Sequence, residues 1–129
     1  MSSQPRDPGG IVPLRWFKYL PAPMFILDRK GKLSYCNDAF VEMTGYRREE
    51  ILGATLDTLV GQEDLKQTLK DILTIYEGRG MARAQYDLLR KSGSRIHVSL
   101  NITPVYGEGE EGAIVISAIG LVMEARELG

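Results

Sequence analysis

Residues 35–53 read YCNDAFVEMTGYRREEILG, and this stretch decides the fold class. Asn37 is a strong helix N-cap, because its side chain can accept hydrogen bonds from the first free backbone N–H groups of a helix. Gly45 is suited to end that helix, since glycine readily adopts the left-handed conformation found at helix C-termini. Arg47 to Leu52 can form a second short helix that Gly53 closes. The stretch therefore predicts two short helices that follow directly on the end of a strand.

The residues before this stretch predict a β-hairpin. Met24 to Leu27 is a short apolar run, Asp28 to Gly31 supplies a turn, and Lys32 to Cys36 gives a second strand. Further upstream, the aromatic run Leu14 to Leu20 can form two helical turns, which Pro21 ends because proline cannot continue a helix.

The residues after it predict one long helix and then three strands. Residues 62–77 carry apolar side chains at helical spacing, which predicts one buried stripe formed by Leu65, Leu69, Ile72, Leu73 and Tyr76. Beyond Gly80 the apolar residues alternate instead, as in half-buried strands. We expect strands at 81–90, 95–105 and 113–119, a tight turn at 91–94 and an acidic loop at 107–112.

The last predicted strand is apolar on both faces. Ile114, Ile116 and Ala118 are expected to face the core. The opposite face then holds Ala113, Val115 and Ile119, and an apolar outer face needs a cover. We interpret this face as a packing or dimer surface, with the residues Trp16, Phe17, Leu20, Val115 and Ile119.

Composition excludes several classes of protein. The chain has 129 residues, 43% hydrophobic and 26% charged, which fits one globular domain. A formal net charge of −1 gives no excess of positive charge to hold a nucleic-acid backbone. No window approaches the roughly 20 apolar residues needed to span a bilayer. The single cysteine, Cys36, cannot form an internal disulfide, so we expect a cytoplasmic location.

These patterns predict a simple layout along the chain. We expect a disordered lead at 1–13, an N-terminal helical segment used for dimerisation at 14–22, and one α+β domain at 23–121. Residues 122–129 favour helix, and we expect them to begin an output helix in a longer protein.

The quoted stretch and its flanks resemble PAS domains. The motifs are Phe25 to Asp28, Tyr35 to Phe40, Thr44 to Tyr46, Glu49 to Gly53, and Arg90 to Ser94 followed by Val98-Ser99 and Thr103 to Val105. The resemblance covers residues 20–123 and implies a five-stranded antiparallel sheet in order 2-1-5-4-3, with helices on one face around a pocket. It also implies a sensory or interaction role in a larger regulator such as a histidine kinase of a bacterial two-component system, a cyclic-di-nucleotide enzyme or a transcription regulator.

Residues 37–53 are especially similar to LOV domains, the flavin-binding light sensors of this family. LOV photochemistry needs a cysteine just after the position of Gly53, and here Leu56 stands in that place. The amide side chains that hold the flavin's polar edge are also missing, with Val98 and Leu100 at the corresponding strand positions. A flavin without such partners leaves its ring amides unsatisfied, at about 1–3 kcal/mol each. Flavin photochemistry is therefore excluded and flavin binding disfavoured.

Haem and catalysis are also disfavoured. Haem needs an axial ligand, and the chain has no His between Gln62 and Gly80, where oxygen-sensing PAS domains carry it. The only histidine, His97, is expected on the polar face of a strand, and Cys36 is expected to be a core residue. No nucleophile with an adjacent base and no cluster of metal ligands is visible, so we expect neither an enzyme nor a metal site.

What remains is a sensor with an apolar pocket. Family position predicts its lining as Phe25, Leu27, Phe40, Met43, Leu56, Leu69, Leu73, Tyr86, Val98, Leu100 and Ile116. Tyr86 or Tyr35 can offer a polar handle to a small apolar ligand. We expect a homodimer that relays ligand binding to an output domain. The alternative is an interaction module whose core is filled and which dimerises without a ligand.

Overall fold

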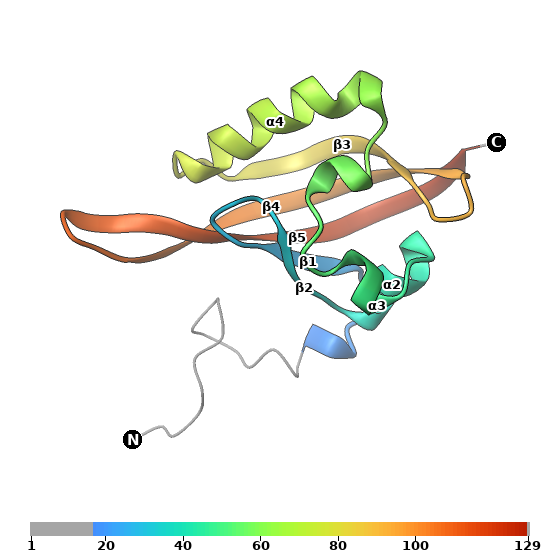
Figure 1. The fold of residues 1–129 in the computed structure, drawn as a ribbon, viewed down its shortest axis with the longest axis horizontal. Helices are drawn as coiled ribbons and strands as arrows, with labels where there is room; N and C mark the ends of the chain where they lie inside the picture. The colour runs from blue at the N-terminus through green and yellow to red at the C-terminus, as the bar shows by residue number, and fades with distance from the viewer. Residues whose placement is uncertain (1–16, 129) are drawn as a thin grey trace.

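The computed structural model describes residues 17–128 and consists of one antiparallel sheet with helices on one side (Figure 1). The five strands lie in the spatial order β2-β1-β5-β4-β3, which confirms the predicted order. In chain order the elements are β1 (Met24–Leu27), β2 (Leu33–Cys36), α2 (Asp38–Thr44), α3 (Arg48–Ile51), a 3-10 turn η1 (Leu56–Thr58), α4 (Gln62–Tyr76), β3 (Met81–Leu89), β4 (Arg95–Gly109) and β5 (Gly112–Leu128).

Asn37 ties three parts of the chain together. Its Oδ1 accepts hydrogen bonds from the backbone N–H groups of Phe40, in the first turn of α2, and of Met24 in β1, both at 3.0 Å. Its Nδ2 donates to the carbonyl oxygens of Phe17 at 3.0 Å and Ala22 at 2.9 Å. The side chain is completely buried with its hydrogen-bonding capacity used, so the predicted N-cap is confirmed and also anchors β1 and the preceding segment.

Gly45 ends α2 as predicted. Its φ of 79° lies in the left-handed region, and its N–H bonds to the carbonyl of Val41. The second helix is shorter than expected, with four residues, and Glu50 stabilises its start by accepting a hydrogen bond from the backbone N–H of Arg47.

The core lies between the sheet and the helices. Phe25 and Leu27 of β1, Leu100 and Ile102 of β4 and Ile75 of α4 are among its buried residues. Met24 and Ile26 lie on the other face of β1 from Phe25 and Leu27, because successive side chains of a strand point to opposite faces. They do not belong to this core cluster, yet they are only 1% and 0% exposed. Both faces of β1 are therefore withdrawn from solvent.

The prediction for the end of the chain was wrong. Instead of a loop at 107–112 and a helix from 122, β4 and β5 form one long hairpin that is paired from Gly109–Gly112 to Arg95–Leu128. Glu124 to Leu128 have local helix propensity, but β4 offers them a complete row of backbone partners, and this pairing prevails over propensity. The hairpin extends beyond the other strands as an arm, seen at the left of Figure 1.

A β-bulge in the arm changes which side chains face the helices. Val105 pairs with Ser117 but Tyr106 pairs with Val115, so Ile116 is the extra residue. The Tyr106 hydroxyl donates to the carbonyl of Gly78 after α4, which places the Tyr106–Val115 pair on the helix side. The expected facing of Ile114 and Ile116 toward the core is therefore wrong, because one extra residue exchanges the faces of a strand.

The predicted N-terminal segment is only partly described. Residues 1–16, which include the expected disordered lead and Trp16, lie outside the described residues. Phe17 and Lys18 are helical, and the Leu20 N–H bonds to the Phe17 carbonyl. A longer helical segment at 14–22 stays a prediction.

Candidate functional site

A small cavity lies between the sheet and α4. Its volume is about 30 Å³, enough for one or two water-sized molecules. The lining comes from β1, α2, the η1 region, α4, β3 and β4, and consists of Phe25, Leu27, Phe40, Leu56, Leu59, Val60, Thr68, Asp71, Ile72, Ile75, Tyr86, Leu88, Leu100 and Ile102. Most of these side chains are aliphatic or aromatic, so the site suits an apolar guest.

The polar groups of the cavity are paired with each other or with the backbone. The Tyr86 hydroxyl on β3 donates to Oδ2 of Asp71 on α4 at 2.6 Å. Asp71 Oδ1 accepts a second bond from Gln67 at 2.9 Å, and the buried Thr68 hydroxyl donates to the carbonyl of Asp64 at 2.8 Å. The Tyr86–Asp71 bond is therefore a direct polar connection between α4 and the sheet.

Burial, and then the hydrogen bond to Asp71, raise the pKa of Tyr86 well above its ordinary value. A deprotonated hydroxyl here would lie against the Asp71 carboxylate in a poorly solvated place. The tyrosine therefore stays protonated and donates to Asp71 throughout the neutral range.

The structure brings together part of the predicted pocket. The predicted pocket residues that line the cavity are Phe25, Leu27, Phe40, Leu56, Tyr86 and Leu100. Val98 is fully buried in the core without lining the cavity, and Met43 packs against the core from α2. Ile116 lies half-buried in the arm, and Tyr35 pairs with Ile26 in the sheet away from the cavity.

Leu69 and Leu73 were placed on the wrong face of α4. They are 53% and 65% exposed, whereas Thr68 and Ile75 are 2% and 1% exposed. Thr68 can be buried because its hydroxyl is satisfied within the helix. The helix therefore presents Thr68, Ile72 and Ile75 to the core, and the two leucines point to solvent.

Several lining residues were missed by sequence reasoning. They are Leu59, Val60, Thr68, Asp71, Ile72, Ile75, Leu88 and Ile102. Leu88 lies two residues after Tyr86, and Ile102 two residues after Leu100. Each pair therefore shares one face of its strand, and the two-residue period of a strand alone could have predicted Leu88 and Ile102. Asp71 carried no such signal, because a charged residue in the middle of a helix normally faces water.

The residues around the cavity do not fit haem or flavin. Among the described side chains that line it there is no His, Cys or Met to serve as an axial ligand, and Leu56 lines it near the place of the LOV cysteine. Its volume of about 30 Å³ is far below the few hundred Å³ typical of cofactor sites.

The chain's other candidate chemical groups lie elsewhere. His97 does not line the cavity but borders a separate polar hollow with Asp64 and Gln67 of α4, with Nδ1 2.6 Å from Asp87 Oδ1 and Nε2 2.7 Å from Gln85 Oε1. Cys36 is fully buried, and burial raises the pKa of its thiol. Within residues 17–128, no three His, Cys, Asp or Glu side chains gather as a metal site would need.

The predicted dimer residues do not form one surface. Ile119 pairs with Ile26 on the outer face, while Val115 is on the helix side of the arm because of the bulge. Leu20 is exposed and Phe17 is half-buried, whereas Trp16 lies outside the described residues. Dimerisation itself stays a prediction.

The family model described as the PAS fold matches residues 17–117. The chain belongs to the PAS family. Its fold is shared by the PAS domain of a Colwellia psychrerythraea protein, with a TM-score of 0.73 at 19% identity over 89% of this chain and 92% of that one. The LOV domain of a blue-light activated histidine kinase from Erythrobacter litoralis gives a TM-score of 0.67 at 23% identity over 85% and 98%.

Curated relatives of this PAS domain include much longer proteins. The human voltage-gated delayed rectifier potassium channel KCNH4 is 33% identical over 84 residues, 64% of this chain and 8% of the channel. The oxygen sensor protein DosP of Escherichia coli is 30% identical over 92 residues, 68% of this chain and 11% of that protein. The chain thus spans about a tenth of the length of these relatives. No helix in the part of the chain that the structure describes is long and apolar enough to cross a membrane.

Proposed function

We propose that this PAS domain is a sensory module that admits a small, mostly apolar molecule beneath α4 and responds through the Tyr86–Asp71 bond. The observation that carries the proposal is a small cavity with apolar walls, at whose edge the Tyr86–Asp71 hydrogen bond joins the covering helix to the sheet. The oxygen sensor DosP and the light-activated histidine kinase support a sensory role for the same fold.

The size of the cavity determines the response. A guest larger than about two waters does not fit in 30 Å³ unless α4 moves outward or a lining side chain changes rotamer. An outward movement of α4 would stretch the 2.6 Å bond between Tyr86 and Asp71. Binding energy would therefore be coupled to the position of α4 against β3, and the guest shifts the equilibrium by its preference for the displaced state.

Outward movement of α4 costs little on its solvent side. Leu69 and Leu73 already face water there, so no packed layer opposes the shift. At its C-terminal end, α4 is held by the Tyr76 hydroxyl, which donates to the carbonyl of Asp28 after β1. Just before its N-terminal end, the Leu89 N–H of β3 donates to the Leu59 carbonyl at 2.8 Å, so both ends are anchored and we infer that the movement is largest in the middle of α4.

The output of the full-length protein is part of the proposal. We expect a larger, cytoplasmic regulator, in which β5 carries the signal out of the domain, because it continues as a strand to Leu128. The domain itself has no catalytic role in this proposal.

The second candidate is an interaction module with a filled core. The small volume of about 30 Å³ favours it, since native interiors contain voids of this size without any ligand. The two candidates differ in whether an apolar guest enters at all.

Xenon is a suitable probe, because it is apolar and small. The test is an NMR titration of the chain under xenon pressure. The sensory proposal expects saturable shifts confined to amides around the cavity and α4, abolished by Leu100→Phe, which fills the space. The matched control Leu69→Phe adds the same bulk on the exposed face and should leave the shifts unchanged. Absence of saturable shifts in the unmodified chain would favour the filled-core module.

A further inference from the structure

The arm formed by β4 and β5 leaves one strand edge open. β1 pairs with β5 only from Ala118 to Leu121, so residues 112–117 of β5 pair with β4 alone. No hydrogen bond from another described element reaches the outer edge of this segment. Alternate residues of an edge strand point their N–H and C=O groups outward, where another strand can pair with them.

The opposite edge of the arm is protected near its base. Pro104 of β4 has no N–H to donate, and the loop after α4 lies against this edge: a Cβ on Gly80 would stand 3.2 Å from the Ile102 carbonyl oxygen and 3.6 Å from Pro104. The Tyr106 hydroxyl also bonds to Gly78 of the same loop. The β4 edge is thus covered up to Tyr106, whereas residues 112–117 of the β5 edge have no such cover among the described residues.

The open segment lacks the usual protection of a solvent-exposed strand. Its sequence is Gly112-Ala113-Ile114-Val115-Ile116-Ser117, without charge or proline. Ile114 and Ile116 lean across the strand onto Gly109 and Gly107, because a Cβ on either glycine would stand 2.8 Å from an isoleucine methyl. This packing leaves the edge itself free, and an uncharged apolar edge of this kind pairs readily with another strand.

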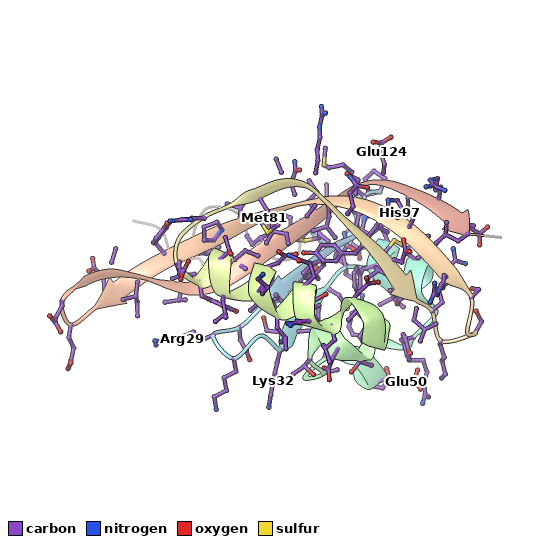
Figure 2. All side chains as sticks on the ribbon, turned by 90° about the horizontal axis from the view of Figure 1, so that it is seen from above. Arg29, Lys32, Glu50, Met81, His97 and Glu124 are labelled. Carbon is purple, nitrogen blue, oxygen red and sulfur yellow. The ribbon has the colours of Figure 1, made fainter. Side chains whose placement is uncertain are left out.

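The charges around the arm identify its partner as a second copy of this chain. The tip carries Glu108, Glu110 and Glu111. The β1–β2 turn carries Arg29, Lys30 and Lys32, and its one carboxylate, Asp28, is already bonded to the backbone N–H groups of Lys30 and Lys32. Arg29 borders the hollow beside the arm, together with Glu77, Ala113 and Val115, and forms no ion pair with a residue in the range 17–128 (Figure 2).

These charges favour an antiparallel over a parallel arrangement of the two paired β5 strands. In an antiparallel pair of two β5 edges about a twofold axis, the tip of each arm reaches residues 117–118 of the other copy, next to that copy's β1–β2 turn. Acidic tip and basic turn then meet at both ends of the pair. In a parallel pair the two acidic tips would lie side by side and repel each other.

We propose that residues 112–117 of β5 are a homodimerisation edge, where two copies pair antiparallel and the glutamates of each tip face the basic β1–β2 turn of the partner. In this dimer Val115 lies at the interface because it belongs to the paired backbone edge of β5, and the outer face of the sheet is not the interface. It does not depend on the cavity taking a ligand.

Charge reversal gives a sharp test. In Glu110→Lys/Glu111→Lys chains, tip and turn are both basic, and in Arg29→Glu/Lys30→Glu chains both are acidic. Each variant alone should dissociate, with the dissociation constant raised at least about tenfold in sedimentation velocity at low salt. Mixed in equal amounts, the two variants should form a heterodimer as stable as the unmodified dimer, because every tip then meets a turn of opposite charge.

Other outcomes overturn the proposal. They are a monomer at every concentration of the unmodified chain, a dimer that neither reversal weakens, and two reversed chains that do not restore each other. Ile119→Lys is the matched control on the outer face of the sheet, and the dimer should survive it. Loss of the dimer in Ile119→Lys, with no effect of either reversal, would assign the interface to the outer face instead. All variants change exposed or half-buried side chains, and circular dichroism verifies folding.

Discussion

The two ends of the helical layer are held in different ways. At the α2 end, Asn37 makes hydrogen bonds to Phe17, Ala22, Met24 and Phe40 and is completely buried. At the α4 end, the helix covers a cavity and is tied to the rest of the domain by the Tyr86 bond to Asp71 and by the Tyr76 bond to the Asp28 carbonyl. One end is fixed by a satisfied polar junction, while the other is free to adjust.

The difference indicates where a signal can enter. A junction with all its polar groups satisfied resists displacement, because any movement leaves buried groups without partners. An apolar cavity under a helix with exposed leucines resists much less, since the contacts that must change around it are dispersion contacts and the Tyr86–Asp71 hydrogen bond. We expect perturbations of the first region to unfold the domain and perturbations of the second to move α4.

The largest effect is expected for Asn37→Ala. The substitution removes all four side-chain hydrogen bonds of Asn37, including those to the buried backbone N–H groups of Met24 and Phe40, which should lower the free energy of unfolding by about 3 kcal/mol or more. Urea denaturation measures it. Asn101→Ala is the matched control, because Asn101 accepts one described bond, from the Arg83 N–H, and should cost about 1 kcal/mol. Equal losses in the two variants would contradict the special role of Asn37.

A smaller effect is expected for Tyr86→Phe. The phenylalanine keeps the ring but removes the donor to Asp71, which should lower the free energy of unfolding by about 1–2 kcal/mol. Tyr106→Phe removes a hydroxyl from an exposed ring, and its effect should be about 0.5 kcal/mol or less. If urea denaturation gave the same loss for both, the Tyr86–Asp71 bond would not be the connection described above.

The same pair predicts a dependence on alkaline pH. The folded state raises the pKa of Tyr86 above the ordinary 10.0, so the stability that it contributes is complete below pH 10.0 and is lost as pH rises toward the folded pKa. Burial also raises the pKa of Tyr76, so some alkaline loss should remain in Tyr86→Phe. The urea midpoint should fall more steeply above pH 10.0 in the unmodified chain than in Tyr86→Phe. Parallel curves would contradict this assignment.

The smallest effect is expected for Glu50→Gln on α3. Lys91, and then the Arg47 backbone, lower the pKa of Glu50 below its ordinary 4.5. Its contribution to stability is therefore present above pH 4.5 and lost as pH falls through the folded pKa. Because both partners reach solvent, we expect a difference from the unmodified chain at neutral pH and low salt that disappears at high salt. A large difference that persists in high salt would contradict a surface ion pair.

Local signals predicted the fixed end well. Asn37 and Gly45 follow rules of helix capping that depend on a few neighbouring residues, and the structure places both as expected. The sheet order came from resemblance to the PAS family, because strand pairing depends on contacts between distant residues.

The adjustable end was predicted less well, for a physical reason. Leu69 and Leu73 are four residues apart on α4, and so are Thr68 and Ile72. Helical spacing alone therefore could not decide which of the two pairs faces the core. Two hydrogen bonds favour the observed orientation of α4: the buried Thr68 hydroxyl donates to a carbonyl within the helix, and the Tyr86 hydroxyl of β3 donates to Asp71. The length of β5 and its bulge at Ile116 also depend on pairing with β4, which outweighs local propensity.

Native-state hydrogen exchange tests the central claim most directly, because it measures the opening free energy of each region separately. The comparison is between the amides of Ile72 and Ile75 in α4 and those of Met24 and Phe40, which bond to Asn37. We predict a lower opening free energy for the α4 amides, lowered further in Tyr86→Phe while the Asn37-bonded amides change only as much as global stability does. Equal opening free energies in the two regions, changed equally by Tyr86→Phe, would contradict the account.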